Sequence, residues 1–478
     1  GGGAGRQVTT GNKNTIVGGL AGDALTDADF NVAIGIQALS ADTLGSRNTA
    51  VGAATLAAQN FTTATNSYNT ALGYYAGASV TTGTENTLVG GLSGDALTTG
   101  IRNVAVGSAA LSGDTKGQNN VAVGYGTLAT QNFTTAVSSY NVAVGAASGV
   151  SITTGIQNTL LGGLAGDALT DADYNVAIGF QALTTDTLGS QSVAIGTAAL
   201  SVQNYTTATD ALNVAVGYNA GAAVSTGFQN TIIGGLAGDA LTDADYNTAL
   251  GSKALTSDTL GSRSTALGRG TLNAQNFTTA TDAYNVAVGF NAGAAVTTGP
   301  RNTLVGGLTG SSINTGYENT CIGYAAGDAL TTGYNNIIIG QSVDADSVSQ
   351  ANAIVIGIGI TGAGNDFTFG TAGNVVSNDF NADANWSRSS DVRLKKNIAD
   401  QTLGLSFIND LRTVKYNWKA SGELDASDAQ LAHLREEDEN GDIINHMDTE
   451  VTMHNFIAQE VKAALDTAGV SDFGGWKE

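Results

Sequence analysis

The chain has 478 residues, of which 65 are glycine and only one is proline. Its 19 Lys and Arg face 41 Asp and Glu, a formal charge of −22, and only nine of the basic residues precede residue 381. So few cations exclude a phosphate-binding stripe along most of the chain, and they argue against nucleic acid and anionic membranes as partners.

Two features that the sequence lacks exclude further classes of protein. The sequence has no run of 18 or more apolar residues and no signal-like amino terminus, so no membrane insertion is expected. Cys321 is the single cysteine, which excludes a disulfide framework.

A five-residue phrase, Asn-Val-Ala-Ile-Gly at residues 31–35, recurs almost to the end of the chain. Its last glycine returns at steps of 17, 17, 21 and 17 residues between Gly18 and Gly306, and at steps of 17 from there to Gly357, so four units form a 72-residue super-repeat. Strict periods of this kind are typical of stacked repeat arrays.

The phrase predicts a short strand. Val32 and Ile34 would point to one face and Ala33 to the other, and Gly35 would allow a sharp bend. A second phrase, such as residues 36–39, reads as another short strand. Each unit then forms one coil of a parallel β-roll or β-solenoid, and twenty rungs about 4.8 Å apart would extend roughly 90–100 Å.

The inward residues are small, so the predicted coil encloses a thin core. We expect the Ala33 faces to be covered by association of three chains around a common axis. The alternative is a monomeric β-helix.

The repeated phrase, including its serine form at residues 192–196, resembles the head repeat of trimeric autotransporter adhesins. It is also similar to repeats of many phage tail-fibre proteins. The resemblance implies an all-β repeat solenoid, a trimeric and left-handed parallel β-roll, as the shaft or adhesive head over residues 1–370. The units are longer than the usual adhesin repeat, so extra loop residues should project outward.

The longest connector occurs once per super-repeat and adds the four residues that turn 17 into 21. Its flanking aromatic residues could stack on a sugar ring or pack back onto the roll. The candidate receptor-binding residues are Phe61, Tyr68, Phe133, Tyr140, Tyr205, Phe277 and Tyr284.

Another connector is rich in acids and suggests a calcium site at Asp23, Asp27 and Asp29. Calcium takes six or more oxygen ligands, and these residues supply only three carboxylates locally. The alternative is that the side chains cap backbone amides in solvated turns. Apart from calcium, no cofactor is expected.

Regular spacing ends after Gly357, and residues 371–388 read as a polar neck. The other ten Lys and Arg lie from Arg388 onward, and residues 389–478 hold all three His, which indicates a separate domain. Apolar spacing predicts helices over residues 402–411 and 458–465, with a strand around Val414 and Tyr416 and a long acidic loop over residues 421–448.

Two phrases in this domain carry a second resemblance. Residues 389–398 and 454–461 resemble the intramolecular chaperone domain of endosialidase-type phage tailspikes and fibres. That domain trimerises, helps the upstream β-structure to fold, and then cuts itself off. The family usually continues with a further long helix, whereas this chain ends at Glu478, so a truncated or uncleaved domain is one expectation.

The resemblance implies a catalytic pair of Ser390 and Lys395 and a cut between Ser389 and Ser390. A serine hydroxyl is inert at neutral pH unless a base takes its proton, and a lysine in a desolvated pocket can be that base. On spacing alone, Ser390 or Asp391 could instead cap a helix, with Lys395 solvated.

Together the patterns predict a phage tail fibre, an extracellular part of the virion that is made in the host cytoplasm. Its expected partners are two further copies of itself, other tail or virion proteins, and a host cell-surface glycan or protein receptor. Autoproteolysis would be a single turnover, so the chain is not expected to be a turnover enzyme.

A terminal chaperone makes physical sense here because some twenty similar rungs are easily misaligned, and cleavage would leave a kinetically trapped fibre. Two alternatives stay open. One is a bacterial surface adhesin, and the other is a glycan-degrading tailspike that uses acid pairs in a groove.

Overall fold

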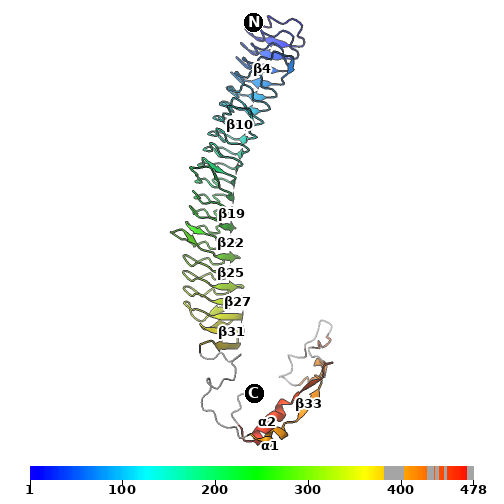
Figure 1. The fold of residues 1–478 in the computed structure, drawn as a ribbon, viewed down its shortest axis with the longest axis vertical. Coiled ribbons are helices and arrows are strands. Elements are labelled where there is room, and N and C mark those ends of the chain that lie inside the picture. The colour runs from blue at the N-terminus through cyan, green and yellow to red at the C-terminus, as the bar shows by residue number, and fades with distance from the viewer. Residues whose placement is uncertain (382–402, 428–434, 436–440, 446–448, 471–478) are drawn as a thin grey trace. The chain divides into compact units, whose positions relative to one another are not determined.

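The computed structural model describes residues 1–381, 403–427, 435, 441–445 and 449–470. The chain divides into two compact units, Gly1–Asn385 and Trp386–Glu478. The first unit is a long β-solenoid of about 21 turns, which confirms the predicted fold class (Figure 1).

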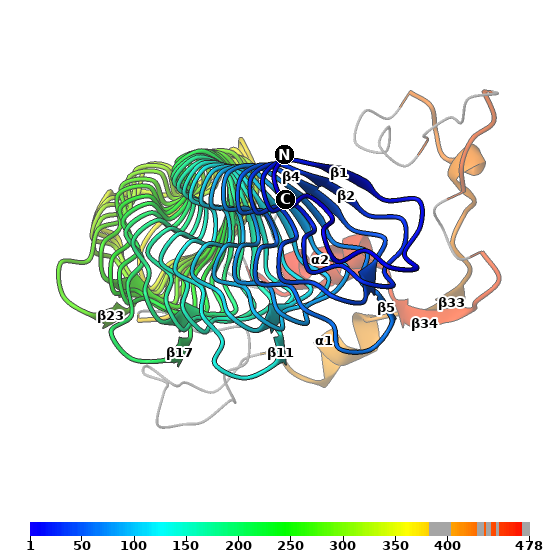
Figure 2. The ribbon, with the colours of Figure 1, turned by 90° about the horizontal axis from the view of Figure 1, so that it is seen from above.

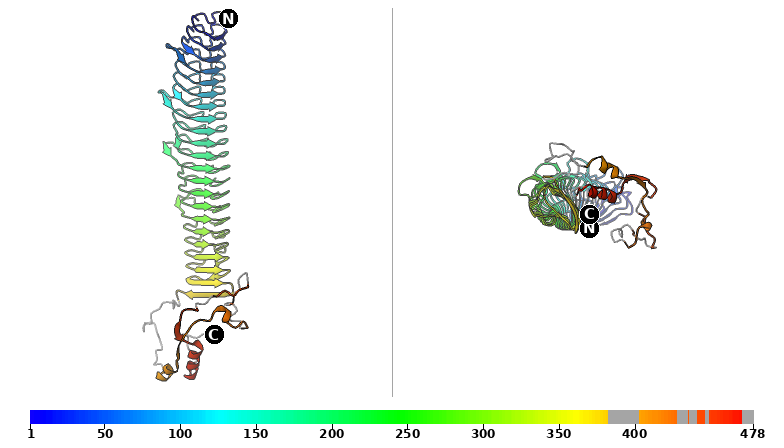
Figure 3. Two further views of the ribbon diagram at one scale, coloured as in Figure 1. Left: turned by 90° about the vertical axis from the view of Figure 1, so that its right-hand side faces the viewer. Right: turned by 90° about the horizontal axis from the view of Figure 1, so that it is seen from below.

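Each coil contributes one strand to a main sheet of 22 strands. Figure 3 shows these strands stacked along the whole solenoid. All but the last are parallel to their neighbours. Their bounds are β1 Thr15–Val17, β2 Val32–Ile34, β4 Thr49–Val51, β6 Thr70–Leu72, β7 Thr87–Val89, β8 Val104–Val106, β10 Val121–Val123, β12 Val142–Val144, β13 Thr159–Leu161, β14 Val176–Ile178, β16 Val193–Ile195, β18 Val214–Val216, β19 Thr231–Ile233, β20 Thr248–Leu250, β22 Thr265–Leu267, β24 Val286–Val288, β25 Thr303–Val305, β26 Thr320–Ile322, β27 Ile337–Gln341, β29 Ile354–Ile358, β31 Asp366–Thr371 and β32 Asn374–Asp379.

A second set of two-residue strands forms five parallel pairs, four of them beside the longer loops. These strands are β3 Gly45–Ser46, β5 Thr65–Asn66, β9 Gly117–Gln118, β11 Val137–Ser138, β15 Gly189–Ser190, β17 Thr209–Asp210, β21 Gly261–Ser262, β23 Thr281–Asp282, β28 Asp344–Ala345 and β30 Thr361–Gly362. Viewed along the solenoid, β5, β11, β17 and β23 lie on loops that stand out from the coil, away from β1, β2 and β4 (Figure 2).

The predicted second strand at residues 36–39 is wrong. Gln37 and Leu39 have φ angles of 57° and 54°, in the left-handed region, so the backbone turns there rather than extending. The turn folds Ala38 and Leu39 back under the strand, where both side chains are fully buried.

The repeated glycine meets a steric need. Gly35 has a φ of 137°, and a Cβ added to it would lie 2.2 Å from the carbonyl oxygen of Gly52 on the next coil. Only glycine tolerates both that backbone conformation and that close approach between coils.

The expected direction of the strand faces is also corrected. Ala33 and its counterparts are fully buried inside the coil of their own chain, against residues such as Leu39. Val32 and Ile34 point out of the coil. The Ala faces therefore cannot pack one chain against another, and the surface left for association is the opposite one.

Each main-sheet strand from β2 to β27 is preceded by a buried asparagine or, at Ser192 and Ser264, by serine. Asn48 donates from its backbone N–H and from Nδ2 to Oδ1 of Asn31, at 2.9 and 3.1 Å. Nδ2 of Asn31 donates to the carbonyl oxygen of Gly45 at 2.9 Å. We call this column the asparagine ladder. It satisfies buried polar groups that the short strands leave unpaired.

The parallel stack ends at β31, and β32 pairs with β31 in the antiparallel sense. The strand β32 thus lies within residues 371–388, the expected neck.

The second unit contains α1 Leu405–Asp410, β33 Thr413–Tyr416, the short 3-10 helix η2 Ser421–Glu423, β34 Met453–Phe456 and α2 Ala458–Thr467. The two helices and β33 lie where apolar spacing predicts them. In the described part of the chain, no helix has the length and apolar character needed to span a membrane.

Candidate functional site

The long loops place their two aromatic residues very differently. Phe61 is only 6% exposed, and Phe133, Tyr205 and Phe277 are buried to the same degree at the equivalent positions. These four side chains pack back onto the solenoid and cannot stack on a ligand. At the other end of the loop, Tyr68 is 53% exposed, and Tyr140 and Tyr284 are exposed in the same way.

The acidic connector does not gather its carboxylates. Oδ1 of Asp27 accepts a hydrogen bond from the Thr10 hydroxyl at 2.5 Å, and Oδ1 of Asp29 accepts one from the backbone N–H of Asn12 at 2.6 Å. Asp23 lies 3.9 Å from Arg6. Within the described ranges, no group of three or more His, Cys, Asp or Glu is placed to share a metal ion. The structure therefore favours the capping role over the calcium site.

The surface that sequence reasoning missed is the outer strand face, which we define as the first and third residues of each main-sheet strand from β1 to β29, with Phe367 and Phe369 at the equivalent positions of β31. The third position is always Val, Ile, Leu or Phe, and the first is always Thr, Val, Ile or Phe. Ile34, Leu72 and Leu161 are among the exposed members. Alternation in the sequence identified the two faces, and only the observed direction of Ala33 shows which one is exposed.

In the second unit, an antiparallel pairing joins the predicted strand β33 to β34, which the sequence did not predict. Strand β33 pairs with β34, so that Lys415 lies opposite His454 and Val414 opposite Asn455. Arg412, just before β33, holds Glu460 of α2 through two hydrogen bonds of 3.1 and 2.5 Å. This contact lowers the pKa of Glu460 and ties the helix to the hairpin.

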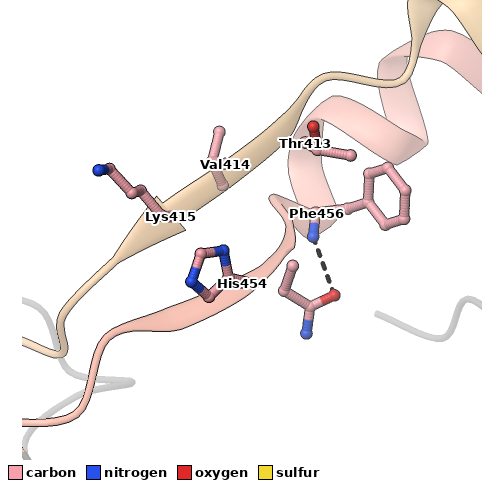
Figure 4. A pocket seen from close by; sticks show the side chains of 6 residues that line it. Thr413, Val414, Lys415, His454 and Phe456 are labelled. Carbon is pink, nitrogen blue, oxygen red and sulfur yellow. Dashed lines mark hydrogen bonds between the residues drawn. The ribbon is translucent and has the colours of Figure 1, made fainter.

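A hollow of about 400 Å³ lies along this hairpin, lined by Thr413, Val414, Lys415, His454, Asn455 and Phe456. Figure 4 shows these side chains on both strands, with the backbone N–H of Phe456 donating to Oδ1 of Asn455 at 2.9 Å. The described residues that line it include no serine and no cysteine.

The described part of the second unit buries little apolar surface within one chain. Among its described apolar residues, only Ala464 and Leu465 are buried, whereas Leu405 and Ile408 on α1 are 75% and 61% exposed. Trp418 and Phe456 are exposed too. A helix that presents its apolar residues to solvent is expected to meet a partner surface.

Ser389, Ser390 and Lys395 lie outside the described residues. Their assignment as cleavage site, nucleophile and base therefore stays a prediction.

Comparison with known proteins bears on the second unit. Searches of curated proteins and of solved structures returned no match. Residues 390–470 match the model of the family described as Chaperone of endosialidase, Peptidase_S74, so the chain carries a domain of this family behind its β-solenoid.

Proposed function

We propose that this chain is a homotrimeric phage tail fibre, an extracellular virion appendage that attaches to a host surface receptor. The solenoid is its shaft or adhesive head. Residues 389–478 are an intramolecular chaperone that aligns three chains and then cuts itself off before Ser390.

The observation that carries this proposal is the Chaperone of endosialidase match at residues 390–470, directly after a solenoid of about 21 similar coils. Slipping one chain by a rung would preserve nearly the same contacts, so such a fibre needs an independent device that sets its register. A terminal domain that trimerises first provides one.

Two surfaces support association of three chains. The outer strand face runs some 100 Å along the solenoid without a charged residue and covers on the order of 1,000 Å². Exposed apolar patches on monomers rarely exceed a few hundred Å². The exposed apolar residues of α1 would likewise be buried if the second units of three chains associated.

The proposed cleavage is an acyl shift followed by hydrolysis. The Ser390 hydroxyl attacks the carbonyl carbon of Ser389 and passes its proton to the Lys395 amine. The C–N bond breaks as the nitrogen of Ser390 takes up a proton, leaving an ester. Water then hydrolyses the ester, which gives a carboxylate on Ser389 and a free amine on Ser390.

Substitution of the two catalytic residues tests this proposal. Ser390→Ala and Lys395→Ala should each leave the chain uncut on a denaturing gel, while Ser389→Ala, which keeps the nucleophile, should still be cut. Normal cutting of Ser390→Ala would refute the assigned nucleophile. Labelling of phage particles with antibody against the solenoid tests the virion role, and label confined to bacterial cell surfaces would contradict it.

A further inference from the structure

The residue before each position of the asparagine ladder forms a second column along the solenoid, which we call the side column. Every member has a φ between 50° and 66°. Five of the nine basic residues that precede residue 381 stand in this column. Its members are Lys13, Phe30, Arg47, Tyr68, Glu85, Arg102, Asn119, Tyr140, Gln157, Tyr174, Gln191, Leu212, Gln229, Tyr246, Arg263, Tyr284, Arg301, Glu318, Asn335, Asn352 and Asn365.

Three of the five cations are neutralised by a neighbouring coil. Arg102 pairs with Glu85 at 2.8 Å, Arg263 with Asp282 at 2.8 Å, and Arg301 with Glu318 at 2.7 Å. Lys13 and Arg47 have no carboxylate of the described residues within ion-pair distance. The two unpaired cations are thus neighbours, separated in the column only by Phe30.

Phe30 holds both charges in place. Nζ of Lys13 lies 4.6 Å and the guanidinium carbon of Arg47 4.8 Å from the centre of its ring. Lys13 and Arg47 belong to coils two rungs apart, which sets their backbones about 10 Å apart along the solenoid. Cation–π contacts of this kind contribute roughly 0.5–1 kcal/mol each at exposed sites, so the pair is ordered without losing its charge.

Arg47 keeps most of its hydrogen-bonding capacity. Its Nε donates to Oδ1 of Asn66 at 3.1 Å, which orients the guanidinium and leaves the terminal nitrogens for a ligand. Tyr68, whose ring centre is 5.8 Å from the guanidinium carbon, adds an exposed aromatic side chain on the next coil. The carboxylates of Asp27 and Asp29, on the same coil as Phe30, accept hydrogen bonds from the Thr10 hydroxyl and the backbone N–H of Asn12.

From this geometry we infer that Lys13, Phe30, Arg47 and Tyr68 bind a carboxylated polysaccharide. One sugar carboxylate meets the terminal guanidinium nitrogens of Arg47, where a two-point contact is available, and a second meets Lys13. Tyr68 packs against an apolar face of a sugar ring. The inference gives the receptor of the proposed fibre a chemical class, and in that respect it rests on the proposed function.

The chain contains its own matched control three super-repeats further on. Arg263 lies between Tyr246 and Tyr284, at 4.7 and 5.9 Å from their ring centres, as Arg47 lies between Phe30 and Tyr68. Asp282 stands there at the position equivalent to Asn66, and its Oδ1 accepts a hydrogen bond from Nε of Arg263, so the guanidinium already has a carboxylate partner. The same stack with an internal carboxylate should not bind an external one.

Binding of fluorescent polygalacturonate to the purified trimer tests the inference. The wild-type protein should bind it, and Lys13→Ala with Arg47→Ala should weaken binding by about tenfold or more. Arg263→Ala should leave binding unchanged. Asp282→Asn should free Arg263 and add a second, weaker site, since Gln229 stands where Lys13 does in the first stack. Fully methyl-esterified polygalacturonate, which has lost its charge, should not bind.

Several results would overturn the inference: no binding by the wild-type trimer, equal binding by the double variant, equal binding of the esterified polymer, or equal binding of oligothymidylate. Thermal denaturation and the native mass of each variant show that it is folded and trimeric. Failure here would leave the Ser390 result, and with it the proposed chaperone, untouched.

Discussion

Nε2 of Gln59 donates a 2.7 Å hydrogen bond to Oδ2 of Asp42, and both residues are fully buried in the solenoid. Oδ1 of Asp42 accepts the backbone N–H groups of Gly45 and Phe61, at 3.0 and 3.1 Å. Oε1 of Gln59 accepts from Nδ2 of Asn69 in the asparagine ladder at 2.8 Å. The start of each longer loop is thus anchored on a buried carboxylate of the preceding coil. The equivalent pairs are Asp114–Gln131, Asp186–Gln203 and Asp258–Gln275.

Removal of this carboxylate should loosen the loop it anchors. Asp42→Ala leaves the donors on Gln59, Gly45 and Phe61 without an acceptor, which costs on the order of 1–3 kcal/mol for a buried donor. Amide hydrogen exchange of residues 59–69 should accelerate. Asp27→Ala, at an exposed aspartate with one hydroxyl partner, should change little, and equal effects of the two variants would contradict the anchoring role.

A second prediction concerns the large inner residue found once per super-repeat. Leu88 fills space beside Gly94, and a Cβ on Gly94 would lie 2.7 Å from Leu88 Cδ2 with a backbone φ of 54°. Gly94→Ala should destabilise the solenoid by about 1–3 kcal/mol. Gly91→Ala is the control, because a Cβ there would lie 3.9 Å from the carbonyl oxygen of Tyr74 and the φ of Gly91 is not positive. Denaturation midpoints of the two variants should differ clearly.

The same site offers a rescue. Ala33 and Leu39 occupy the positions of Leu88 and Gly94 on another coil, and Leu39 adopts a φ of 54° there. The double variant Leu88→Ala, Gly94→Leu rebuilds that arrangement and should be more stable than Gly94→Leu alone, as measured by thermal denaturation. If the double variant were no more stable than Gly94→Leu, the side chains at positions 88 and 94 would not be filling the same space.

Charges on the outer strand face should prevent association. Ile34→Glu, Ile178→Glu and Ile322→Glu together would bury carboxylates without partners, at a cost of several kcal/mol each. Native mass should shift from trimer to monomer while the β-sheet circular dichroism remains. Thr62→Glu, Thr134→Glu and Thr206→Glu place the same charges on the exposed loops and should leave a trimer. A trimeric triple-Ile variant would exclude this face as the interface.

The carboxyl end of the solenoid should respond to pH. Burial and the neighbouring Asp328 raise the pKa of Asp344 from 3.8 to about 6. A folded-state pKa above the unfolded value gives stability that is present below about pH 4 and is lost as the pH rises through 6. The wild type should therefore lose on the order of 1 kcal/mol more than Asp344→Asn between pH 4 and pH 8 in denaturant titrations. Parallel pH profiles would contradict this.

The repeat phrase was enough to predict the solenoid, because glycine spacing and the alternation of Val, Ala and Ile are local properties. Which face of the strand points into the coil is not determined by the strand residues alone. Whether Ala33 or Ile34 faces inward depends on residues 36–39, where the backbone turns through left-handed conformations. The residue types at Gln37 and Leu39 do not predict such conformations. The aromatic pair of the long loop was likewise ambiguous, since Phe61 and Tyr68 have similar apolar area but only one packs against the coil.

The buried Asp42 could not be distinguished from the many polar connector residues, because its partners Gln59 and Phe61 lie on the next coil. The contacts within the side column could not be predicted from the sequence for the same reason. Lys13, Phe30 and Arg47 are each 17 residues apart, and their contacts appear only when coils stack in register.

The mass of the purified, denatured chain tests the proposed self-cleavage most directly. A species ending at Ser389, together with a fragment beginning at Ser390, is the predicted result for the wild type, with the intact chain in Ser390→Ala. A wild-type chain that remains intact through Glu478 after trimerisation would contradict it.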